Sequence, residues 1–178
     1  MQKIARTLVW IDDMVLKITL GICGGLLTVM VVVAAMGVFF RFMLHASLSW
    51  SEELDAYLFV WLTCLGAAAG VKIRAHPEVR AIADRLPSFT QKWLGDFTDG
   101  IVLALGLIFV IYGMEMVSLM GTETAASLPI SMVYPYLSIP VGGALLIWHS
   151  AVRILVSHLA PGVRQDSVAA AHAIPLHI

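Results

Sequence analysis

The chain has 178 residues, of which 60% are hydrophobic and 13% are charged, whereas an ordinary globular domain is roughly 45–50% apolar and about 25% charged. This composition excludes a disordered chain, a disulfide-stapled secreted module and a collagen-like fibre, and it favours an integral membrane protein. The 11 basic residues against 12 acidic ones give a formal net charge of −1, which argues against a nucleic acid partner.

Four apolar stretches are long enough to cross a bilayer core of about 30 Å, which takes roughly 20 helical residues. The sequence Ser49-Trp50-Ser51-Glu52 is typical of a capping box and starts the second helix ahead of its uncharged run. Pro129, Pro135 and Pro140 confine the regular part of the fourth span to about residues 134–156. The predicted spans cover about residues 18–40, 50–72, 97–120 and 133–156. We therefore expect an all-α integral membrane protein, with one four-span bundle in residues 1–160.

The segment before the first span is amphipathic. Its apolar stripe consists of Ile4, Leu8, Ile11, Val15 and Ile18, and its charged residues lie opposite. We expect an amphipathic interfacial helix at the N-terminus, lying on the cytoplasmic surface of the membrane before the first span. Asp12 and Asp13 interrupt any basic leader region, and the apolar run that follows exceeds the roughly 7–15 residues of a signal peptide. The first span is therefore predicted to remain uncleaved.

Basic residues are distributed unevenly between the two sides that four spans create. Ten of the 11 fall on the side that holds both ends of the chain, and Arg41 is alone on the other side. Because Lys and Arg resist translocation, we expect a multi-pass protein whose N- and C-termini are cytoplasmic. Residues 161–178 are small and polar, and we expect them to form a mobile cytoplasmic tail.

Few residues inside the spans are suited to chemistry. Glu115 fits either a proton or cation site or a structural carboxylate that reaches the outer interface, pairs with Arg41 or is protonated. A b-type haem would normally need a second histidine at the depth of His149 on a neighbouring helix. The sequence offers none there, because His45 and His76 lie at the ends of spans on opposite sides of the membrane. The sequence contains no HExxH, no Gly-rich phosphate loop and no CxxC, and Cys23 and Cys64 lie in apolar runs. We therefore predict no catalytic residue, cofactor or metal.

The second span carries candidates for helix contact. Gly66 and Gly70 share one face, and this spacing lets another helix approach closely, most simply within the four-helix bundle. Trp61 points away from that face and fits either lipid exposure or contact with another membrane subunit. Trp50 belongs to the aromatic belt expected at the outer interface.

The outer side is acidic. Its five acids are Glu52, Glu53, Asp55, Glu115 and Glu123. We expect Arg41 to pair with Glu52 or Glu53, because an unpaired charge at the edge of a low-dielectric region is costly. The remaining acidic charge, with Glu123 as its exposed member, is either ordinary solvated loop charge or a surface that steers a basic patch of a partner.

Several motifs follow one another in an order that resembles the DctQ family, the small membrane subunit of tripartite ATP-independent periplasmic (TRAP) transporters. The first motifs are Arg41-Phe42, Trp50-Ser51-Glu52-Glu53-Leu54, Tyr57-Leu58-Phe59-Val60-Trp61-Leu62 and Gly66-Ala67-Ala68. His76 follows the second span, and a proline-containing entry to the fourth runs from Leu128-Pro129-Ile130 to Ile139-Pro140-Val141-Gly142. Pro77 departs from the family, which more often has an aliphatic residue there.

The resemblance covers about residues 18–156 and implies a bacterial inner-membrane subunit without enzymatic activity. Such a subunit pairs with a large membrane subunit that carries substrate and sodium, and a periplasmic substrate-binding protein delivers an organic acid. The small subunit would brace the stationary scaffold of the large one. Two other interpretations are a four-span membrane redox or enzyme subunit that uses His149 or His76, and a self-sufficient small transporter.

Overall fold

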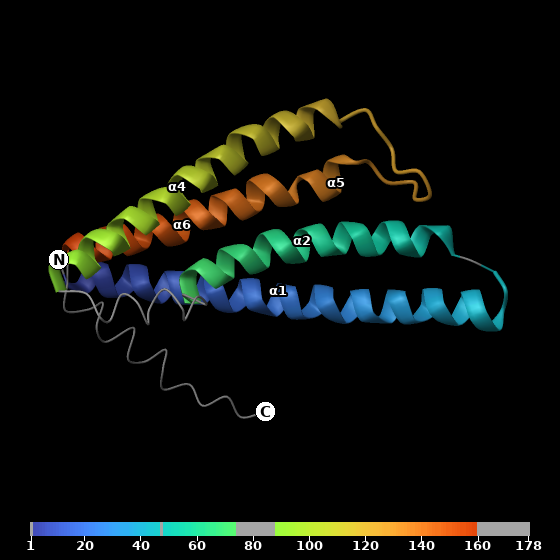
Figure 1. Cartoon of the computed structure of the whole chain (residues 1–178), viewed down its shortest axis with the longest axis horizontal. Helices are drawn as coiled ribbons and strands as arrows, with labels where there is room; N and C mark the ends of the chain where they lie inside the picture. The colour runs from blue at the N-terminus through green and yellow to red at the C-terminus, as the bar shows by residue number, and fades with distance from the viewer. Residues whose placement is uncertain (1, 47, 74–87, 160–178) are drawn as a thin grey trace, which may run out of the picture.

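The computed structural model describes residues 2–46, 48–73 and 88–159, and these are almost entirely helical (Figure 1). The helices are α1 (Gln2–Met43), α2 (Ser49–Ile73), α4 (Ser88–Leu119), α5 (Val133–Tyr136) and α6 (Ser138–Leu159). Four stretches are long and apolar enough to span a membrane: Ala5–Met43, Ser49–Ile73, Phe97–Leu119 and Val133–Val156. The predicted all-α fold with four transmembrane helices is therefore confirmed. His76 and the tail predicted over residues 161–178 lie outside the described residues.

The first helix is longer than the sequence predicted. α1 runs without a break through 42 residues, which corresponds to roughly 63 Å at about 1.5 Å per residue, about twice the thickness of a bilayer core. A separate amphipathic interfacial helix is not shown, because Leu8 and Val15 of the predicted stripe belong to the first turns of α1. Among the α1 residues whose burial the structure describes, the buried ones are Ala5, Asp12, Thr19 and Val33. These positions recur at multiples of seven, so α1 packs along one seam that includes the predicted interfacial segment.

The long helices lie side by side in the order α1, α2, α6, α4 (Figure 1). α1 packs mainly on α2, and α4 mainly on α6, while α2 and α6 pack on each other. The central position of α6 explains why its span is the most buried, whereas α1 and α4 expose most of their apolar side chains. The arrangement is more open than a closed four-helix bundle, and its edges offer apolar surface to lipid or to another protein.

Glycines on α6 allow close contacts with both neighbouring helices. A Cβ added to Gly143 would lie 2.8 Å from the carbonyl oxygen of Gly106 and 2.8 Å from Cβ of Phe109, both on α4. On the other side of α6, a Cβ added to Gly142 would lie 2.9 Å from Cβ of Cys64 on α2. The missing side chains thus let α4 and α2 approach α6 on both sides.

The glycine contact that the sequence predicted on α2 is absent from the described chain. A Cβ added to Gly66 or Gly70 would meet no described atom within 4 Å, so the prediction that this pair packs tightly within the bundle is wrong. The reason is the rotation of α2, which turns Cys64 toward α6 and leaves the Gly66/Gly70 face pointing away from its neighbours.

A matched pair of glycine substitutions distinguishes the closely packed glycine of α6 from the glycine of α2 that has no close contact. We expect Gly143→Ala to destabilise the protein by about 1–3 kcal/mol, because the new methyl group meets backbone atoms that cannot move aside. Gly66→Ala should be neutral or stabilising by about 0.5–1 kcal/mol, since it removes a glycine from a helix interior without a clash. Thermal unfolding in detergent measures both, and equal midpoints for the two variants would contradict the packing described.

Candidate functional site

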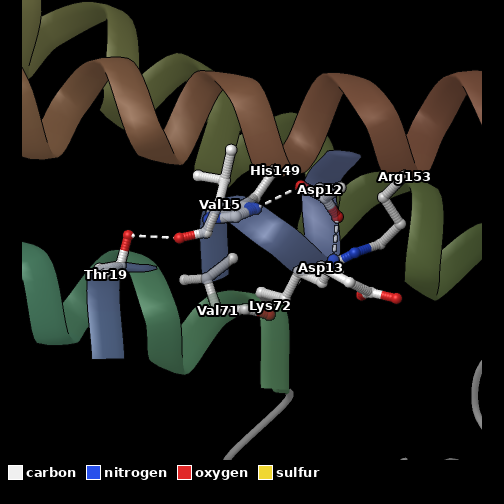
Figure 2. Close-up of polar contacts among 8 residues, drawn as sticks. All are labelled: Asp12, Asp13, Val15, Thr19, Val71, Lys72, His149 and Arg153. Carbon is white, nitrogen blue, oxygen red and sulfur yellow. Dashed lines mark hydrogen bonds and ion pairs between the residues drawn. The ribbon is translucent and has the colours of Figure 1, made fainter. Parts of the chain in front are cut away.

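A buried ionic contact joins α1, α2 and α6 at one end of the layer. Asp12 of α1 lies with its Oδ1 atom 2.6 Å from Nδ1 of His149 on α6, as Figure 2 shows. Lys72 of α2 forms an ion pair with the other oxygen of Asp12 and donates to Oδ1 of Asp13 at 2.7 Å. The side chain of His149 is 0% exposed and that of Asp12 is 8% exposed. Buried charges of this kind are tolerated only when they are paired.

A second ionic contact extends the network to α4. Arg153 of α6 donates from Nη1 to Oδ1 of Asp99 on α4 at 2.6 Å, and from Nη2 to the carbonyl oxygen of Val71 on α2 at 2.7 Å. Asp99 is buried and Arg153 is mostly buried. We define the Asp12 cluster as Asp12, Asp13, Lys72, Asp99, His149 and Arg153. Its members come from all four spanning helices, and we call this end of the layer the Asp12 end.

The Asp12 cluster is built to hold helices together rather than to react. Nδ1 of His149 is occupied by Asp12, while Nε2 is buried and has no hydrogen-bond partner among the described residues. A catalytic histidine needs a free nitrogen within reach of a substrate, and Nε2 is enclosed by protein. The described residues also contain no group of three His, Cys, Asp or Glu side chains that could hold a metal ion. The geometry thus gives no support to a redox or enzymatic role for His149.

A second polar contact holds the loop between α4 and α5 at the opposite end, which we call the Glu53 end. Glu53 of α2 accepts hydrogen bonds from the backbone N–H groups of Ala126 at 3.0 Å and Ser127 at 2.7 Å. The hydroxyl groups of Ser127 and Tyr57 donate to the same carboxylate. An isolated bridge between Thr124 and Ser131 closes the loop on itself. Glu53 is therefore a structural residue that fixes this loop to α2.

The remaining predicted residues at the Glu53 end have distinct roles. The predicted pairing of Arg41 is confirmed with Glu52, although the two side chains are 56% and 71% exposed and the pair contributes little to stability. The expectation that Trp61 faces lipid or another subunit is incomplete, because its Nε1 donates to the carbonyl oxygen of Tyr134 at 3.1 Å and joins α2 to α5. Trp50 is half-buried, and Glu115 and Glu123 are exposed.

Sequence reasoning missed most of the Asp12 cluster. From the sequence, Asp12 argues only against a signal peptide, and Lys72 and Arg153 are two of the ten basic residues that predict the orientation. The signal in the sequence is the spacing of seven residues from Ala5 to Asp12 and from Asp12 to Thr19, which places the three on one side of α1. The more prominent apolar stripe of the same segment draws attention to a different face. The partners themselves are far apart in the sequence, so only the helix arrangement reveals them.

The sequence matches a known family over most of its length. Residues 30–158 match the family described as "Tripartite ATP-independent periplasmic transporters, DctQ component". The chain is 32% identical over 107 residues to the C4-dicarboxylate TRAP transporter small permease protein DctQ of Rhodobacter capsulatus, covering 56% of this chain and 45% of that one. It is 32% identical over 82 residues to a putative TRAP transporter small permease protein of Haemophilus influenzae, covering 46% and 51%.

A longer relative is also similar. The chain is 29% identical over 112 residues to the isethionate TRAP transporter permease protein DctMQ of Oleidesulfovibrio alaskensis, covering 62% of this chain but 17% of that protein. The alignments with the two small permease proteins span about half the length of each.

Two neighbouring aspartates provide a matched test of the buried cluster. Asp12→Asn removes the buried charge that faces Lys72 and His149, and we expect a loss of about 2–4 kcal/mol in unfolding free energy. Asp13→Asn removes a half-exposed charge that faces Lys72 alone, and we expect a loss within about 0.5 kcal/mol. Unfolding of both variants in detergent gives the comparison, and an Asp13 variant at least as damaging as the Asp12 variant would refute the central role of Asp12.

Proposed function

Because the chain belongs to the DctQ family of tripartite ATP-independent periplasmic transporters, we propose that it is the small membrane subunit that braces the large membrane subunit of such a transporter. The family consists of transporter components, so a transport role takes the place of an enzymatic one. The observation that carries the proposal is the family match over residues 30–158, which includes most of the described spans.

The isethionate relative supports a large membrane partner. A stretch similar to this chain forms only a small part of that permease protein, so a region of this kind works there within a much longer membrane chain. The surfaces on this chain that are free to contact such a partner are the exposed apolar edges of α1 and α4 and the Gly66/Gly70 face of α2. Small residues on that face would permit close approach by a helix of the partner.

The ionic and polar contacts fit a bracing role. The Asp12 cluster ties all four spanning helices at one end, and Glu53 ties the loop to α2 at the other. Both contacts are cross-links between elements distant in sequence, and both would resist sliding of the helices. A stationary support for a moving transport domain needs this rigidity, whereas a chain that itself alternates between two states needs an element with two arrangements.

We further propose that the transporter imports an organic acid together with sodium and receives it from a periplasmic substrate-binding protein. Two relatives are named for the organic acids C4-dicarboxylate and isethionate. The polar clusters that the structure describes lie at the Asp12 end and the Glu53 end of the layer. At the Glu53 end, the basic residue Arg41 is already paired with Glu52. A carboxylate or sulfonate needs fixed donors, so we assign substrate binding to the other components.

The Asp12 end is proposed to face the cytoplasm of a bacterial inner membrane, because that side of the sequence holds ten of the 11 basic residues. The Glu53 end would then face the periplasm and the binding protein. Glu123 is exposed in the loop at this end, where it can attract a basic patch on that partner.

Reconstitution with omitted components tests the proposed function. Proteoliposomes that contain this chain, the large subunit and the binding protein should take up the organic acid with a sodium gradient, and omission of any one component should abolish uptake. Calorimetry on this chain alone should give no saturable heat with organic acids. Uptake or saturable binding by the isolated chain would instead identify a self-sufficient transporter.

Charge reversal at Glu123 tests docking of the binding protein. We expect Glu123→Lys to raise the concentration of binding protein needed for half-maximal uptake by roughly fivefold at low salt, and by less at physiological salt, because exposed charges are screened. Glu123→Gln is the control and should give a smaller shift in the same direction. Copurification of the large subunit should be unchanged, and a salt-independent loss of uptake would argue against electrostatic docking.

Cysteine labelling tests the orientation. In a chain whose Cys23 and Cys64 are replaced by serine, a membrane-impermeant thiol reagent added from the periplasmic side should label a cysteine at Glu123 and spare one at Lys3. Labelling of the Lys3 position from that side would invert the topology.

A further inference from the structure

One side of α1 near the Asp12 end carries basic and aromatic side chains that face away from the protein. Arg6, Trp10, Asp13 and Lys17 lie at successive spacings of four, three and four residues, so they share one helical face, and Lys3 extends it by one turn. All are exposed, Trp10 to 65%. We define the α1 basic face as Lys3, Arg6, Trp10 and Lys17.

The opposite side of α1 is the packed one. Ala5, Asp12 and Thr19 are buried there against the rest of the protein, and α1 is an edge helix of the layer (Figure 1). The α1 basic face therefore points outward, toward whatever surrounds the protein at this end. The buried seam fixes this rotation, and the contacts of Asp12 with Lys72 and His149 are its polar part.

The charge of this face is positive in spite of Asp13. Asp13 lies among the basic residues and accepts from Lys72 of α2 at 2.7 Å, but Lys72 is shared with Asp12. Even with Asp13 counted in full, the three cations Lys3, Arg6 and Lys17 leave this face positive. Within the part of the chain that the structure describes, neither Arg6 nor Lys17 forms an ion pair. The face thus presents unneutralised cations, which fit an anionic partner.

The position of the α1 basic face along the helix indicates that its anionic partner is the membrane surface. Lys17 directly precedes the uncharged run that starts at Ile18, so it lies where the hydrocarbon begins. Trp10 lies about 10 Å further along the helix at about 1.5 Å per residue, at the depth where exposed tryptophans favour the headgroup layer. Arg6 lies one turn beyond, within about 8–10 Å of that layer, over which surface charge is felt at physiological salt.

We propose that the α1 basic face binds the headgroups of anionic phospholipids. Arg6 and Lys17 would contact phosphate oxygens, for which guanidinium and ammonium groups are suited donors, and Trp10 would insert its indole between them at the interface. This surface differs from the predicted interfacial helix, in which the apolar stripe would lie in the membrane plane. It is independent of the transport role, because it rests on α1 alone and its contacts with α2 and α6.

A lipid titration of the full-length chain tests the proposal. In mixed micelles doped with phosphatidylglycerol or phosphatidylcholine, native mass spectrometry should show preferential retention of phosphatidylglycerol by the wild-type chain. The double variant Arg6→Gln/Lys17→Gln should weaken that retention by roughly 30-fold, since each basic residue at a membrane surface contributes about fivefold. Soluble glycerol phosphate at the same concentration should not compete, because it lacks the acyl chains that hold the lipid at the interface.

The control variant removes the same number of positive charges from another part of the sequence. Arg80→Gln/Arg85→Gln removes two positive charges from the sequence between α2 and α4 and should retain phosphatidylglycerol as the wild type does. Equal loss in the two double variants would overturn the proposal in favour of a general effect of net charge. Equal retention of both lipids by the wild type would also overturn it and would leave an acidic protein surface as the occupant of this face.

Discussion

The fold depends on the pairing of one buried carboxylate. Asp12 lies where α1, α2 and α6 meet, and a charge in this position is tolerable only with Lys72 and His149 beside it. These contacts set the depth and rotation of α1, which otherwise buries few side chains. The same rotation is shared by Ala5, Thr19 and Val33, the other buried residues of the α1 seam, and it directs the α1 basic face outward.

The two ends of the layer are stabilised in different ways. At the Asp12 end, charged side chains cross between helices and are largely buried. At the Glu53 end, a carboxylate accepts backbone N–H groups of a loop, and the ion pair between Arg41 and Glu52 is exposed. Between the ends, glycines on α6 allow close packing without polar contacts. This division suits a membrane protein, because polar groups are least costly near the interfaces and most costly at mid-depth.

The open arrangement of the four long helices fits the supporting role that we propose for this DctQ-family subunit. A closed bundle would hide its apolar side chains, whereas this layer exposes those of α1 and α4 and leaves the Gly66/Gly70 face of α2 without a close neighbour among the described residues. Such surfaces are what a subunit needs if its main task is to support a larger membrane partner.

The sequence alone determined the number and approximate position of the spans, since apolar length is a local property, and it also determined the family through Trp50, Glu52 and neighbouring motifs. It predicted the Arg41 pair because candidates were few on that side. It missed that α1 is continuous, that Gly66 faces outward, and that Asp12 meets Lys72 and His149. Those outcomes depend on the rotation of each helix about its axis, which is set by packing against helices distant in sequence, and only the tertiary structure decides it.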